Sequence, residues 1–209
     1  MSEEEIRHVW KALGHERLSI AATLKLALLT AQRRSEVLGI RWDELDLETR
    51  WWTIPAERSK NKLAHRVPLA SQALDLLARL REQAHGSAYV FPGSKKEPIA
   101  NLQKPMRSIR QRTGIEFRFH DLRRTAASHM TGIGISRLVV SKILNHAERD
   151  VTAVYDRHSY DPNKQEALLQ WDKRVDQILR KATATGHNVV ALVPRPVGKK
   201  GGTRRAKVS

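Results

Sequence analysis

The sequence of 209 residues contains no cysteine, which excludes disulfide bonds, thiolate nucleophiles and cysteine-ligated zinc sites. It also lacks any apolar run that approaches the roughly 20 residues needed to cross a bilayer. The first residues, Met1-Ser-Glu-Glu-Glu, are acidic and polar, whereas a secretory signal peptide begins with basic and then apolar residues. These absences predict a cytoplasmic protein that has no membrane partner.

Acidic residues are scarce relative to basic ones, with 22 Asp and Glu against 38 Lys and Arg and a net charge of +16. So large an excess favours a polyanionic partner, because basic side chains displace the counterions that condense on nucleic-acid phosphates. Ribosomal and membrane-surface proteins are also basic, so the charge by itself leaves a merely solubilising surface open. Nucleic acid is the leading partner class.

Helical spacing of apolar residues dominates the chain. Ser2 and Glu5 form the pattern of a capping box at the start of a first helix. The nearly continuous apolar content of residues 18–29 predicts a second helix at the centre of the core. Further helices are expected at residues 35–39, 71–84, 101–112, 121–130, 136–144 and 162–182.

One part of the chain has a different pattern. Apolar residues in 42–54 alternate around a polar turn, which predicts a β-hairpin, and residues 65–69 predict a third strand that Pro68 ends or confines to an edge. The fold class is therefore mainly α with a small antiparallel β-sheet (α+β), in one domain over residues 1–184. Residues 185–209 are basic and rich in proline and glycine, which predicts a disordered tail.

Two polar stretches place reactive side chains where a helical scaffold does not need them. In Thr30-Ala-Gln-Arg-Arg-Ser-Glu36, two arginines follow an apolar helix; alone, this is typical of a surface turn with a local ion pair. His120 and Arg123 share a helix face at spacing i, i+3. A neighbouring cation keeps an imidazole neutral, which suits a proton acceptor near an anion, although a solvated helix face has the same pattern.

A third stretch, Leu144-Asn-His146, is followed nine residues later by Tyr155. A phenol has a reference pKa near 10 and is a poor nucleophile at neutral pH unless a base or clustered positive charge assists it. Most tyrosines are core or rim residues, so Tyr155 alone indicates little. Its significance depends on the other two stretches.

Taken in order, the three stretches resemble the motif boxes of the tyrosine recombinases, the phage-integrase family. Thr30-Ala-Gln-Arg33-Arg-Ser-Glu36, followed by Ile40-Arg-Trp42, is similar to the family's Thr-Gly-x-Arg-x-x-Glu box and its Leu-x-Trp. His120-Asp-Leu-Arg123 is similar to the His-x-x-Arg box, and Leu144-Asn-His146 with Tyr155 to the Leu-Gly-His box and its tyrosine. The resemblance covers about residues 1–180, and Lys60 resembles the family's catalytic lysine.

Some positions depart from the pattern or compete for a role. Ala31 and Asn145 stand where the family has glycine, and we expect altered backbone detail there rather than lost chemistry. Three other residues compete for assigned roles: Arg34 for Arg33, Lys62 for Lys60 and Tyr160 for Tyr155. The spacing to Glu36 disfavours Arg34, and the spacing to His146 disfavours Tyr160.

The resemblance implies cleavage and rejoining of double-stranded DNA through a 3′-phosphotyrosyl intermediate, as in site-specific recombination and the DNA integration of prophages. It also implies self-association as a tetramer on DNA. No metal or cofactor is implied, because the protein supplies the cations, and Glu36 is a support for the arginine segment. The implied catalytic residues are Arg33, Lys60, His120, Arg123, His146 and the nucleophile Tyr155.

Three alternatives stay open at this point. The resemblance implies a separate N-terminal DNA-binding domain ahead of the catalytic one, and the expectation that this chain is a domain without it motivates a non-catalytic DNA-binding remnant of an integrase. A type IB topoisomerase shares the same chemistry. A basic RNA-associated helical protein would match the boxes by accident and would not need Tyr155.

Overall fold

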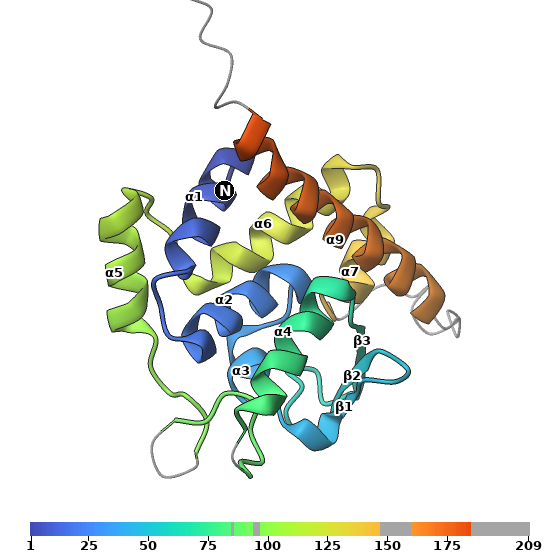
Figure 1. The fold of residues 1–209 in the computed structure, drawn as a ribbon. Helices are drawn as coiled ribbons and strands as arrows, with labels where there is room; N and C mark the ends of the chain where they lie inside the picture. The colour runs from blue at the N-terminus through green and yellow to red at the C-terminus, as the bar shows by residue number, and fades with distance from the viewer. Residues whose placement is uncertain (85, 94–96, 147–159, 185–209) are drawn as a thin grey trace, which may run out of the picture.

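The computed structural model describes residues 1–84, 86–93, 97–146 and 160–184 (Figure 1). Helices surround a central helix, and a small antiparallel sheet lies to one side of them, which confirms the expected class. The predicted tail, residues 185–209, lies outside the described residues. The elements are α1 (Glu3–Leu13), α2 (Leu18–Thr30), α3 (Arg34–Leu38), the 3₁₀ turn η1 (Trp42–Glu44), β1 (Leu45–Asp46), β2 (Trp51–Ile54), β3 (His65–Pro68), α4 (Ser71–Glu82), α5 (Gln103–Thr113), α6 (Phe119–Gly132), α7 (Arg137–Ile143) and α9 (Asp161–Ala184).

The predicted capping box begins α1. The Ser2 hydroxyl accepts a hydrogen bond from the Glu5 amide at 3.2 Å, and the Glu5 carboxylate accepts one from the Ser2 amide at 2.7 Å. Both donors would otherwise lack an intrahelical partner. Glutamates also fill the first turn, where their negative charge interacts favourably with the helix dipole.

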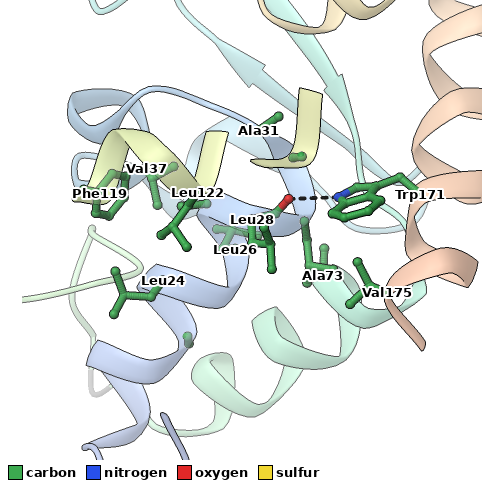
Figure 2. Close-up of a cluster of buried hydrophobic side chains, with 14 of the residues drawn as sticks. Leu24, Leu26, Leu28, Ala31, Val37, Ala73, Phe119, Leu122, Trp171 and Val175 are labelled. Carbon is green, nitrogen blue, oxygen red and sulfur yellow. Dashed lines mark hydrogen bonds between the residues drawn. The ribbon is translucent and has the colours of Figure 1, made fainter. Parts of the chain in front are cut away.

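Helix α2 forms the centre of the core, as its apolar sequence predicts. It contacts α4, α6 and α9, and Leu24, Leu26 and Leu28 lie among side chains from these neighbours (Figure 2). Trp171 of α9 is fully buried, and its indole N–H donates to the carbonyl of Leu28 at 2.9 Å. That carbonyl lies in the last turn of α2, where carbonyls have no partner within the helix, so the bond satisfies two buried polar groups at once.

The sheet has the order β1-β2-β3, with Leu45 opposite Trp52 and Trp52 opposite Val67. The third strand ends at Pro68 and lies at an edge, as predicted. The antiparallel pair of β1 and β2 confirms the hairpin predicted within residues 42–54, but its first strand begins only at Leu45, because Trp42–Glu44 forms a 3₁₀ turn. Its cause is the Glu44 carboxylate, which accepts hydrogen bonds from Trp52 Nε1 at 3.0 Å and from Arg58 Nε at 2.8 Å and thereby holds this segment in a turn.

Helix α6 begins at Phe119, two residues before the predicted start. Asp121 is not the first residue of the helix but its third, and its carboxylate accepts from the Arg118 amide at 2.8 Å. His120 therefore lies within the first helical turn. Helix α9 runs across α1, α2, α6, α7 and β3 (Figure 1). Among the described helices, none combines the length and apolarity needed to span a bilayer.

Candidate active site

Arg123, on α6, is the buried centre of the site, with 4% of its surface exposed. Its Nη1 donates to the carbonyl of Ala31 at 2.7 Å, and its Nη2 donates to the carbonyl of Leu144. Burial lowers the pKa of Arg123 to about 10, the charge of Arg33 acts in the same direction, and Glu36 opposes both. The guanidinium is thus charged at neutral pH, and it has more N–H donors than these two bonds use.

Arg33 lies at the start of α3, near Arg123. Its Nη1 donates to Glu36 Oε1 at 3.1 Å and its Nη2 donates to the carbonyl of Asn145 at 2.9 Å. The Glu36 carboxylate is completely buried and also accepts from the Arg33 amide at 2.8 Å. A buried carboxylate that accepts two hydrogen bonds from one residue excludes the interpretation of this stretch as a surface turn. The competing Arg34 is exposed and donates to the carbonyl of Ala100 at 3.0 Å.

His146 follows α7, and its side chain is largely accessible. Partial burial lowers its pKa, and the positive charges of Arg123 and then Arg33 lower it further. His120 and Lys60 also lower the pKa of His146, so both side chains lie in the same neighbourhood. The ring is therefore neutral at neutral pH and offers one N–H donor.

The structure thus brings together the side chains of five residues that the sequence singles out. Two are guanidiniums fixed by the backbone, and three are at the surface: His120 in the first turn of α6, Lys60 between β2 and β3, and His146 after α7. The sixth, Tyr155, lies outside the described residues. Its competitor Tyr160 directly precedes α9, and the ammonium of Lys142 lies 4.4 Å from the centre of its ring.

The end of α7 organises this cluster, which the sequence analysis missed. Three successive carbonyls, those of Ile143, Leu144 and Asn145, accept hydrogen bonds from side chains of other elements. The Ile143 carbonyl accepts from Gln32 Nε2 and from His65 Nε2, both at 3.0 Å; the Leu144 carbonyl accepts from Arg123; and the Asn145 carbonyl accepts from Arg33. Carbonyls at a helix C-terminus lack intrahelical partners and carry partial negative charge, so they suit cationic donors.

The two positions where the resemblance expects glycine are both left-handed in backbone conformation. Ala31 has φ 56° and Asn145 has φ 48°. Non-glycine residues rarely adopt this region, although asparagine does so more readily than most. The carbonyl of each of these two residues accepts a hydrogen bond from a guanidinium. Alanine and asparagine in place of glycine therefore keep the backbone geometry that holds the two arginines.

Asn145 also contacts the segment that carries Lys60. Its Nδ2 donates to Ser59 Oγ at 3.0 Å, and its Oδ1 accepts from Asn61 Nδ2 at 2.8 Å. An asparagine in a left-handed turn after a helix is a recognisable sequence signal for a C-terminal cap. Its bonds to residues more than 80 positions away are not readable from one sequence.

Chemically, two fixed guanidiniums and a neutral imidazole can bind the non-bridging oxygens of one phosphate group, because a planar guanidinium matches two phosphate oxygens at once. A nearby ammonium and a second imidazole can give and take protons. Within the described part of the chain, no group of three or more histidine, aspartate or glutamate side chains is arranged to hold a metal ion.

The cationic cluster of this helical domain suits a phosphate group, and comparison with known proteins identifies the family. The chain belongs to the phage integrase family, whose model matches residues 1–161, and it corresponds to the tyrosine recombinase catalytic domain. The integrase of Enterobacteria phage P4 is 30% identical over 173 residues, which cover 74% of this chain and 39% of that protein.

Solved structures share the fold. The integrase from mycobacterium phage Brujita matches with a TM-score of 0.62 at 19% identity, over 85% of this chain and 62% of that one. A lambda integrase tetramer bound to a Holliday junction matches with a TM-score of 0.58 at 18% identity, over 77% and 49%. The chain spans only 35–42% of the length of the first curated relatives that it matches.

Proposed function

We propose that residues 1–184 form the catalytic domain of a site-specific recombinase that cleaves and rejoins double-stranded DNA through a 3′-phosphotyrosyl intermediate. The observation that carries this proposal is the pair of guanidiniums, Arg33 and Arg123, fixed by backbone carbonyls next to a neutral His146. Fixed donors stabilise charge that develops in a transition state without having to reorganise. A cluster of this kind suits a phosphodiester under attack.

In the cleavage step, Arg33, Arg123 and His146 bind the non-bridging oxygens of the scissile phosphate. The phenol oxygen of Tyr155 attacks phosphorus, and its proton passes to His120. The bond from phosphorus to the 5′ oxygen breaks with its electron pair going to that oxygen, which takes a proton from the Lys60 ammonium. Attack by a 5′-hydroxyl of another strand reverses every step, so no external energy source is needed.

The partners follow from the same proposal. The substrate is double-stranded DNA, which the net charge of +16 favours, and a cytoplasmic location follows from that substrate. Assembly on DNA as a tetramer is supported by the lambda integrase tetramer on a Holliday junction, which shares the fold. Residues 185–209 are proposed to be a basic tail outside the domain, and no cofactor enters the mechanism because the protein supplies the cations.

Covalent capture tests the proposal. The chain is incubated with a pool of nicked duplexes that carry a randomised central segment, and DNA that becomes attached to protein is isolated under denaturing conditions and sequenced. We expect adducts with wild type and with Tyr160→Phe, and none with Tyr155→Phe, which should still shift DNA reversibly. Adducts that persist in Tyr155→Phe and disappear in Tyr160→Phe would overturn the choice of nucleophile. Binding without adducts in wild type would support the non-catalytic remnant instead.

A further inference from the structure

We propose that Asn145 is a positioning residue for Lys60: its carboxamide bonds to the residues on both sides of the lysine and so holds the general acid at the leaving 5′ oxygen. This inference rests on the proposed function. It concerns a side chain at a position where the family resemblance expects none, and it assigns a role in protonation rather than in phosphate binding.

The geometry is that of a clasp around Lys60. On one side, Asn145 Nδ2 donates to Ser59 Oγ at 3.0 Å; on the other, Asn61 Nδ2 donates to Asn145 Oδ1 at 2.8 Å and to the Asn145 carbonyl at 3.3 Å. Ser59 is 2% exposed and also donates from its hydroxyl to Asn61 Oδ1 at 3.3 Å. Both neighbours of the lysine are therefore fixed by one side chain.

The same residue also reaches the phosphate-binding groups. The Asn145 carbonyl accepts from Arg33 Nη2 at 2.9 Å, and His146 is the next residue in the chain. Asn145 thus fixes the distance between the segment that carries the acid and the groups that bind the non-bridging oxygens. Since the acid must reach the bridging oxygen of the phosphate that these groups hold, this distance decides whether the proton arrives.

Lys60 needs such support because it is exposed and has a long, flexible stem. A lysine side chain has many rotamers of similar energy, so its reach is defined mainly by where its backbone is held. Backbone bonds in this segment are local, such as those from the Ser59 amide to the Pro55 carbonyl and from the Lys62 amide to the Ser59 carbonyl, both 3.1 Å. Arg58 attaches the start of the segment to Glu44 and, through Nη1 at 3.4 Å, to the Glu36 carbonyl, but it lies before Ser59 and does not bond to either neighbour of Lys60.

The backbone conformation of Asn145 makes a variant without its side chain practicable. Its φ of 48° is a conformation that glycine adopts without steric cost, whereas a side chain there is strained. The Asn145→Gly variant therefore removes the clasp and relieves strain, so loss of folding is not the expected result. The carbonyl that binds Arg33 remains in this variant.

The test compares two DNA substrates that differ in one atom. In the second, sulfur replaces the 5′ bridging oxygen of the scissile phosphate, so the bond from phosphorus to sulfur breaks and the thiolate leaves without a proton. We expect Asn145→Gly to slow adduct formation on ordinary DNA by about tenfold to a hundredfold, the size of effect that a small misplacement causes. On the sulfur substrate it should react at the wild-type rate, as Lys60→Ala should.

Two further variants complete the experiment. Asn61→Ala removes the other half of the clasp and should show the same recovery on sulfur DNA, which keeps the test decisive if Asn145→Gly fails to fold. Lys62→Ala, in the same exposed segment, is the matched control and should react like wild type on both substrates. Equal slowing of both substrates by Asn145→Gly, or no slowing, overturns the positioning role. If wild type forms adducts on neither ordinary DNA nor sulfur DNA, the result contradicts the proposed function itself.

Discussion

Replacing His65 by glutamine should remove a large part of the acid sensitivity of this fold. His65 is 6% exposed, and its Nε2 lies 3.0 Å from the Ile143 carbonyl. A carbonyl only accepts, so the neutral ring carries its proton on Nε2. Burial lowers the pKa of His65 from 6.5 to about 4, and the charges of Lys164, Arg123 and Arg33 act in the same direction.

The direction in which pH changes the stability depends on whether the folded or the unfolded chain binds the proton at the higher pH. As the pH falls below 6.5, the unfolded chain takes up a proton on His65, whereas the folded chain does so only near pH 4. The contribution of His65 to stability is therefore complete above pH 6.5 and is lost as the pH falls toward 4. At about 1.4 kcal/mol per pH unit, the loss is roughly 2 kcal/mol at pH 5 and roughly 3 kcal/mol at pH 4.

Urea unfolding of wild type and His65→Gln at pH 7 and pH 5 measures this directly. Between the two pH values, wild type should lose about 2 kcal/mol more unfolding free energy than the variant. Other groups whose pKa is shifted, such as His146 and Asp172, are present in both proteins and cancel in the difference. The same pH dependence in both proteins would mean that His65 titrates alike when folded and unfolded, and it would contradict the effect of burial on this ring.

Two further substitutions test the supports of the site and of the core. Glu36→Gln removes the charge that accepts from the Arg33 amide and Nη1, and it should lower the free energy of unfolding by about 1.5–3 kcal/mol and slow covalent adduct formation; unchanged values in urea and adduct assays would contradict the support role. Trp171→Phe leaves the Leu28 carbonyl buried without its partner and should cost about 1–3 kcal/mol, so a melting curve that matches wild type would show that the bond contributes nothing.

Local patterns in the sequence predict much of this fold. The capping box at Ser2, the largely apolar helix α2 and the edge strand ending at Pro68 depend on neighbouring residues, and all three are confirmed. The errors arise where a side chain acts at a distance. Trp42 alternates like a strand residue, but bonds from Trp52 and Arg58 to Glu44 impose a turn, and these partners are 8 and 14 residues away.

The site divides in the same way. The order and spacing of the motif boxes indicate Arg33, Arg123 and His146, and the structure places them together. The carbonyls that hold the arginines are not predictable, because the bonds join residues 92 and 112 positions apart and depend on left-handed turns at Ala31 and Asn145. A polar side chain such as Asn145 shows its role only when both of its partners are known.

The path of α9 across the core has a consequence for how the chain folds as it is synthesised. Trp171 bonds to a residue 143 positions earlier, and Arg174 pairs with Glu3, 171 positions earlier. A ribosome releases α2, α4 and α6 before α9, so the side of α2 that α9 covers stays exposed until nearly all the described residues have been made. Such distant contacts slow folding, and apolar surface that is prone to aggregation stays exposed until they form.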